Sequence, residues 1–279
     1  MSISSTLNRI HSQAKRNHWL WLFSIFCRFS LAAGFIPAGI VKIMDERFAS
    51  GLSVIHPMGT YLNALHHTGF YYTFIGIAQI AAAIFLLIPR TVTLGAFLYF
   101  PIILNICILT FAVRFDGSLF TAPLMTLANL FLLGWNYEKW KYILPFNRLE
   151  HDVAERETFV RDFPVNQSAN DERGVFSRYG IGSLYARFLV FIKQLFSDKF
   201  PLLFFAGVFA AVIFFMFIVP RLYDVKPRNS FAACQKQFAG KNRTQAGDAF
   251  CNCVHTTGNP LDQCLGEYEN APDDTISAP

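Results

Sequence analysis

Five strongly polar side chains within the apolar stretches between residues 19 and 136 are the first candidates for chemistry. A charge near the centre of a bilayer costs about 2.5–3.5 kcal/mol, so Arg28 should face other helices rather than lipid. Its guanidinium offers donors but no acceptor, whereas amide side chains offer both. We predict a site that holds a polar or quinone-like headgroup; the alternative is that these groups only bond neighbouring helices. The predicted ligand-binding residues are Arg28, Lys42, Gln79, Asn105 and Asn129.

A second group of candidates lies between Asp45 and Thr68, where the chain carries three histidines. The stretch from Pro57 to His67 is predicted to lie along the membrane interface, with Met58, Tyr61, Leu62 and Leu65 dipping into lipid. Histidines at that level would carry protons for a redox reaction, or would only be amphipathic surface residues. In the next loop on the same side, Arg114 and Asp116 are predicted to form a local charge pair.

The last chemical feature is a set of cysteines crowded into the C-terminal tail: Cys234, Cys251, Cys253 and Cys264. An even set in a short helical segment is typical of disulfide bonds in an oxidising compartment. Two bridges would add roughly 3 kcal/mol each to a tail with little core of its own. A redox pair at Cys251 and Cys253, or a zinc site completed by His255, are the alternatives. The spacing does not determine which cysteines pair.

The elements that position these residues follow from composition, because 53% of the chain is hydrophobic and only 15% is charged. Segments of about 20 apolar residues cross the hydrocarbon layer as helices. The predicted fold is an all-α membrane protein, with a four-helix transmembrane bundle, a fifth transmembrane helix and a small disulfide-stapled helical tail. The predicted spans are Trp19–Met44, Gly69–Pro89, Thr91–Val113, Ser118–Asn136 and Pro201–Val219.

Orientation follows from the cations, which precede the first span and fill the long segment after the fourth. By the positive-inside rule, the N-terminus is predicted to be cytoplasmic and the tail extracytoplasmic, in a bacterial inner (plasma) membrane. The predicted organisation is a cytoplasmic N-terminus over 1–18, the bundle over 19–136, a cytoplasmic segment over 137–199, the fifth span over 200–220 and the tail over 221–279.

The cytoplasmic segment is predicted to contain a flexible linker over Val165–Gly174 and an interfacial helix over Ile181–Phe196. The chain carries no phosphate-cradling glycine loop, no nucleophile beside a base and no metal-ligand cluster, so no catalytic residue and no metal are assigned. Its positive charge is accounted for by topology and anionic lipid, so the bilayer is the expected partner and nucleic acid is not.

The order of these features resembles the DoxX family of four-helix membrane proteins. The resemblance covers Trp19–Trp135 and rests on Cys27-Arg28, Gly39 to Lys42, "GIAQIAAAIFLLIPRT" from Gly76, "PIILNICILT" from Pro101 and "LANLFLLGWN" from Leu127. It implies a link to membrane redox chemistry and to partner enzymes, with Arg28, Lys42, Gln79 and Asn105 matching the polar positions. Family members often carry an acidic residue in the second helix. This chain has Gln79 at that position, and its amide does not titrate.

Three functions of different classes follow. The first is a subunit of a membrane redox system that binds a quinone in the bundle and works with a redox enzyme. The second is a non-catalytic scaffold whose cysteine tail docks an exported protein. The third is a carrier for a small anionic solute, drawn by Arg28 and Lys42, although the chain lacks a detectable inverted repeat.

Overall fold

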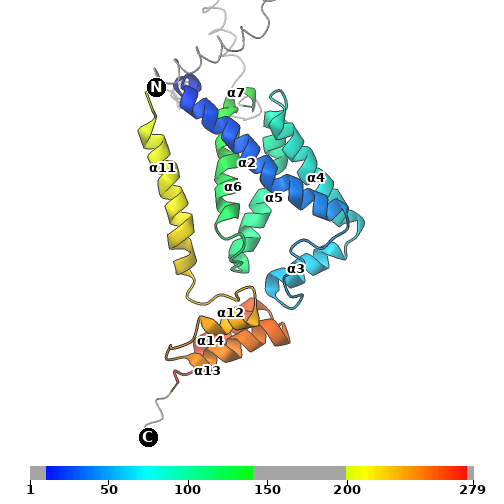
Figure 1. Ribbon diagram of the computed structural model, residues 1–279, viewed down its shortest axis with the longest axis vertical. Coiled ribbons are helices and arrows are strands. Elements are labelled where there is room, and N and C mark those ends of the chain that lie inside the picture. Colours follow the sequence, from blue (N-terminus) through cyan, green and yellow to red (C-terminus); the bar gives the residue numbers. More distant parts are fainter. Residues whose placement is uncertain (1–10, 141–198, 275–279) are drawn as a thin grey trace, which may run out of the picture. The chain divides into compact units, whose positions relative to one another are not determined.

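The computed structural model describes residues 11–140 and 199–274, which contain helices and no strand (Figure 1). This confirms the predicted all-helical fold class. The predicted linker over Val165–Gly174 and the predicted interfacial helix over Ile181–Phe196 lie outside the described residues. The α-helices are α2 (His18–Ile43), α3 (Pro57–His66), α4 (Phe70–Leu87), α5 (Val92–Ala112), α6 (Thr121–Trp135), α7 (Tyr137–Trp140), α11 (Leu202–Ile213), α12 (Phe231–Lys236), α13 (Thr244–Asn252) and α14 (Leu261–Asn270).

Four helical segments are long and apolar enough to cross a membrane: His18–Ile43, Phe70–Leu87, Val92–Ala112 and Leu202–Leu222. They correspond to four of the five predicted spans. The last of them continues α11 through a π-helical turn (Phe214–Ile218) and a 3-10 turn (Val219–Leu222). Among the four, it is the least buried within the protein, with 6% of its most apolar stretch buried.

The remaining predicted span, Ser118–Asn136, is a shorter helix than expected, because α6 has only 15 residues. At 1.5 Å per residue α6 is about 22 Å long, against a hydrocarbon thickness of about 30 Å. The missing turn is a loop over 116–120, in which the Ser118 hydroxyl bonds the Thr110 hydroxyl at the end of α5 at 2.7 Å. This bond ties the loop before α6 to the end of α5.

The chain divides into two compact units, residues 1–25 with 134–202, and residues 26–133 with 203–279. In the first unit, His11 lies 3.1 Å from both the Trp135 carbonyl and the Glu138 carboxylate, and the Lys15 ammonium lies 4.4 Å from the Trp135 ring. The Asn17 side chain accepts from the Trp19 amide and so caps the start of α2. The contacts of His11 and Lys15 connect residues 11–15 to residues 135–138.

Glycine sets the distance between helices in the second unit. A Cβ on Gly39 of α2 would lie 2.8 Å from the Gly76 carbonyl of α4, and a Cβ on Gly76 would lie 2.8 Å from the Gly39 carbonyl. A Cβ on Gly95 of α5 would lie 2.6 Å from the Leu86 nitrogen. Small residues let backbones approach closely where lipid provides no hydrophobic drive between helices.

The tail folds into a helical unit that we call the cysteine module, residues 229–274. Disulfides join Cys234 of α12 to Cys251 of α13, and Cys253 to Cys264 of α14. Phe238 and Phe250 are almost fully buried between the bridges. The predicted disulfide stapling is confirmed, and the alternative of a Cys251–Cys253 redox pair does not form because the two sulfurs belong to different bridges.

We expect Gly95→Ala to destabilise the protein, because the added methyl group would meet α4 backbone atoms of Phe85 and Leu86 that cannot turn away. Overpacking of this kind costs about 1–3 kcal/mol, so the unfolding midpoint in lipid nanodiscs should fall by several degrees. Gly207→Ala is the control, since a Cβ at Gly207 meets nothing within 4 Å. Equal midpoints for the two variants would contradict the close α4–α5 contact.

Candidate functional site

Lys42, at the C-terminal end of α2, is enclosed by aromatic rings. It is only 6% exposed, and its ammonium lies 4.5 Å from the Phe48 ring and 5.8 Å from the Tyr72 ring. The ammonium donates to the Ala38 carbonyl one turn earlier at 3.0 Å. The Tyr72 hydroxyl in turn donates to the Glu46 carbonyl and accepts from the Phe48 amide. Lys42 therefore closes the end of α2 through cation–π contacts and a backbone hydrogen bond.

Three of the other predicted site residues lie inside the bundle with part of their hydrogen-bonding capacity unused. Arg28 is half-buried and its Nε is without a partner among the described residues. Gln79 is 2% exposed and its Oε1 is likewise without a partner. Asn129 is fully buried; its amide donates to the Ala96 carbonyl at 3.1 Å, but its Oδ1 accepts nothing.

Arg28 and Gln79 do not lie at one level. Arg28 lies three helical turns, about 16 Å, before Gly39 on α2, whereas Gln79 lies less than one turn after Gly76 on α4. Because Gly39 and Gly76 touch, Arg28 and Gln79 sit at different depths. Asn105 of α5 is exposed on the surface of the bundle. Gln79 and Asn105 therefore do not join Arg28 in the single amide-ringed site that the sequence led us to expect.

The predicted interfacial helix forms as α3, but its apolar side faces protein. Met58 and Leu62 are buried with Leu52 against Leu109 and Val113 at the end of α5. The prediction that they dip into lipid is wrong. The end of α5 provides the apolar surface that these side chains contact, whereas the sequence alone suggested that they contact lipid.

His56 starts α3 and is fully buried. Its Nδ1 accepts a hydrogen bond from the Met58 amide at 3.1 Å, which caps the helix, so the ring proton is on Nε2. Burial and, after it, the His255 ring with its centroid at 5.7 Å lower the pKa of His56 to about 4, against the opposing effects of the Arg228 backbone and Asp116. His56 is thus a neutral structural cap near neutral pH.

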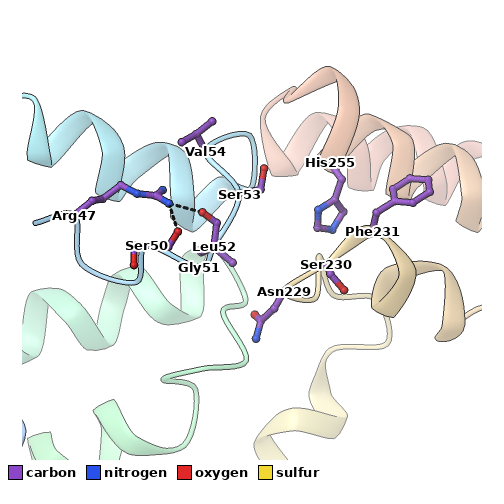
Figure 2. Close-up of a pocket in the computed structure, with 10 residues that line it drawn as sticks. All are labelled: Arg47, Ser50, Gly51, Leu52, Ser53, Val54, Asn229, Ser230, Phe231 and His255. Carbon is purple, nitrogen blue, oxygen red and sulfur yellow. Dashed lines mark hydrogen bonds between the residues drawn. The ribbon is translucent and has the colours of Figure 1, made fainter.

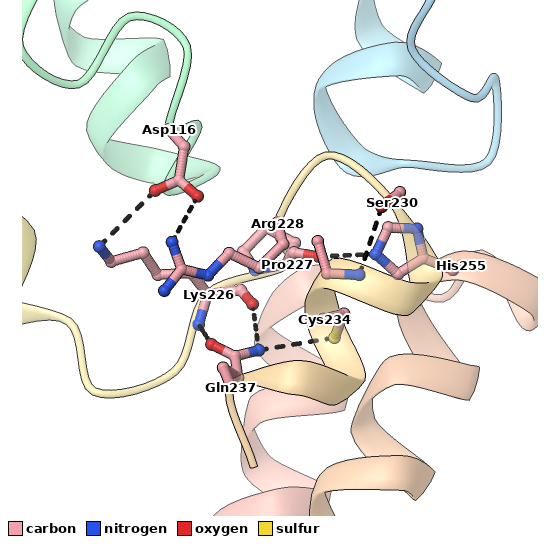
Figure 3. A network of polar contacts seen from close by, with 9 residues as sticks. Asp116, Lys226, Pro227, Arg228, Ser230, Cys234, Gln237 and His255 are labelled. Atoms are coloured by element: carbon pink, nitrogen blue, oxygen red, sulfur yellow. Dashed lines mark hydrogen bonds and ion pairs between the residues drawn. The ribbon is translucent and has the colours of Figure 1, made fainter. Parts of the chain in front are cut away.

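Asp116, in the loop between α5 and α6, binds the segment that leads into the cysteine module (Figure 3). Its carboxylate accepts from the Arg228 guanidinium at 2.9 Å and lies 3.6 Å from the Lys226 ammonium. Arg114 was predicted to pair with Asp116. Instead, it donates to the Val225 carbonyl at 2.8 Å and stacks on the Tyr223 ring. The predicted local Arg114–Asp116 pair is wrong, because both side chains reach residues more than a hundred positions away.

The segment that contains Lys226 is also hydrogen-bonded to the cysteine module. The Gln237 side chain bonds the Lys226 backbone twice, donating to its carbonyl at 2.7 Å and accepting from its amide at 3.2 Å (Figure 3). Lys226 is 5% exposed, and this burial lowers its pKa, against the opposing effect of Asp116. Arg114 and Arg228 both have positive φ, at 50° and 55°. Such left-handed backbone costs about 1–2 kcal/mol per residue, which the contacts of these two arginines must offset.

A cavity of about 510 Å³ opens between the module and the loop that follows α2 (Figure 2). In that loop the Arg47 guanidinium is fixed by bonds to the Ser50 and Leu52 carbonyls, at 2.7 and 2.6 Å. From the module, the His255 ring projects toward the same space, and Phe231 lies beside it (Figure 2). The lining residues are Arg47, Ser50, Gly51, Leu52, Ser53, Val54, Asn229, Ser230, Phe231 and His255. Sequence analysis missed this site, because nothing in the local pattern of either segment points to the other.

We expect stability to fall on acidification through His56. Its folded pKa of about 4 lies below its ordinary value of 6.5, so the stability that the neutral ring contributes is complete above pH 6.5. It is lost as pH falls toward 4, by up to roughly 3 kcal/mol. Thermal unfolding in nanodiscs between pH 7 and pH 4 should show this loss as a falling midpoint.

His56→Asn keeps a capping side chain but cannot titrate near neutral pH, so the variant should lose part of that pH dependence. His67→Asn, which changes an exposed histidine at the opposite end of α3, should keep it. If wild type and His56→Asn have the same pH profile, the assignment of this slope to His56 is wrong.

Comparison with known proteins places part of the chain in a family. It is 31% identical over 113 residues to the "Uncharacterized protein YwoB" of Bacillus subtilis (strain 168), covering 39% of this chain and 72% of that protein. No family model matches the sequence, and no solved structure matches it. The aligned share of YwoB and the level of identity show a common family. The chain therefore belongs to the same family as YwoB.

Proposed function

We propose that the protein is a non-catalytic membrane scaffold that holds its cysteine module ready to dock an exported protein. The observation that carries this proposal is the joint between module and bundle: Asp116 clamps Lys226 and Arg228, and Arg114 holds the Val225 carbonyl. Two disulfides make the module rigid in itself. A surface that is already ordered loses little entropy when a partner binds.

The proposed location is a bacterial inner membrane, with the N-terminus in the cytoplasm and the cysteine module outside. Disulfide bonds persist in oxidising compartments and are rare in the cytosol, which supports an extracytoplasmic module. The excess of cations before the first span and after the fourth supports the same orientation. The docked protein would then be one that is secreted or anchored on that side.

A photo-reactive phenylalanine analogue at Phe231 tests the docking role in cells that express the full chain. Phe231 is 40% exposed on α12, so we expect irradiation to produce a covalent adduct of one discrete mass. The matched control places the analogue at Phe29, which is 62% exposed on α2 and should meet lipid. The same analogue at Asp262, on α14, samples a second part of the module.

A protein adduct from Phe231 or Asp262 that Phe29 does not give would support the scaffold. Absence of any protein adduct from both module positions, or the same adduct from Phe29, would contradict it. Because each variant changes one exposed side chain, the disulfides and the Asp116 contacts stay in place, and correct insertion can be verified from disulfide state.

The second candidate is a DoxX-like subunit of a membrane redox system, with a quinone as its ligand. It is favoured by one observation, that the buried amide oxygens of Gln79 and Asn129 accept no hydrogen bond. In lipid no water can satisfy them, and most buried polar groups have a partner. A ligand with donor groups, such as a quinol headgroup, would satisfy these oxygens.

Binding of a fluorescent quinol analogue to the protein in nanodiscs tests this candidate. We expect Asn129→Leu to weaken binding about tenfold, the effect of losing one hydrogen bond of about 1.5 kcal/mol. Asn105→Leu, the same substitution on the exposed side of α5, should bind as wild type does. No saturable binding to wild type, or equal loss in both variants, would remove the quinone from consideration.

A further inference from the structure

Neither function proposed above requires a ligand in the cavity between the loop after α2 and the cysteine module, although Phe231 of its lining also serves as a reporter position for docking. Its volume of about 510 Å³ is in the range that accommodates small organic ligands. One wall belongs to the membrane bundle and the other to the module, and the joint at Asp116 holds the two together. The cavity is therefore as permanent as that joint.

The charge of the cavity has one sign. Arg47 is the formal cation of the lining, and none of the ten lining residues is Asp or Glu. Asp45, two positions before Arg47, is engaged elsewhere, since its carboxylate lies 3.5 Å from His66. One guanidinium nitrogen of Arg47 holds the Ser50 and Leu52 carbonyls, while its other terminal nitrogen is itself buried and has no partner among the described residues. An anion in the cavity would lie near a positive charge that is already fixed in place.

The module contributes polar groups with capacity to spare. The Nε2 of His255 lies 2.6 Å from the Pro227 carbonyl and so carries the proton, which leaves Nδ1 to the cavity side. Ser230 accepts from the Ala233 amide, and its hydroxyl proton remains available as a donor. Asn229 is exposed beside it. These groups would orient a polar ligand without adding a negative charge.

The rest of the lining is apolar. Leu52 and Val54 come from the loop, and the Phe231 ring, 40% exposed, stands beside His255 (Figure 2). Exposed aromatic rings next to polar groups are typical of sites whose ligands have an apolar body and a polar end. A bare inorganic anion would leave these apolar side chains uncovered.

We propose that this cavity binds a small organic monocarboxylate with an aromatic or aliphatic body. The carboxylate lies toward Arg47, with Ser230 and Asn229 as further donors. The apolar body covers Phe231 and Leu52. The proposal is independent of a docked protein and of a quinone, because it uses no residue of the bundle interior and no exposed face of the module outside the cavity.

Phenylacetate is a suitable probe, measured by equilibrium dialysis of the radiolabelled compound against the full-length protein in nanodiscs. We expect saturable binding, and binding of phenylacetamide at least tenfold weaker, because the amide has the same shape without the charge. Saturable binding of phenylacetamide with equal affinity, or no saturable binding of phenylacetate, would overturn the proposal.

A pair of variants locates the site. Asn229→Asp places a carboxylate in the lining and should weaken phenylacetate binding about tenfold or more, through repulsion and competition for Arg47. Asn242→Asp makes the same change of charge on an exposed part of the module outside the lining and should leave binding unchanged. Equal affinity in wild type and Asn229→Asp would overturn the assignment, and so would equal loss in both variants. Intact disulfides in each variant verify that the module has folded.

Discussion

One carboxylate, that of Asp116, joins the membrane bundle to the cysteine module. Of its two cationic partners, Lys226 is almost completely buried, and a buried ammonium without an opposite charge would be unfavourable by several kcal/mol. The favourable position of the module is therefore the one that puts Lys226 and Arg228 beside Asp116. The cavity and the contact between His56 and His255 both depend on that position of the module.

The membrane explains why the helices were predictable and the site was not. Without water, the backbone must satisfy its own hydrogen bonds, so long apolar runs such as Val92–Ala112 have one outcome. The cysteines were equally informative, because an even set in a short tail is typical of structural bridges.

The polar residues could not be placed by the same reasoning. Arg28, Gln79 and Asn129 each lie in a different helix, and their relative depth depends on where Gly39 meets Gly76. The sequence contains no local signal for that register. The partner of Asp116 was even harder to predict, because Arg228 lies 112 positions away in the sequence. Arg114, only two positions from Asp116, was the simpler choice. Met58 and Leu62 were misassigned to lipid because the end of α5 provides an apolar surface of the same kind.

The two disulfides also dictate an order of assembly. The helix α13 carries Cys251 near its end and is followed at once by Cys253, so both bridges must close before the turn that presents His255 is fixed from either side. A chain with reduced cysteines would keep the apolar helices that a membrane requires but would lack the covalent links between α12, α13 and α14. Maturation of the protein thus requires two different processes, insertion of apolar helices and oxidation of four thiols.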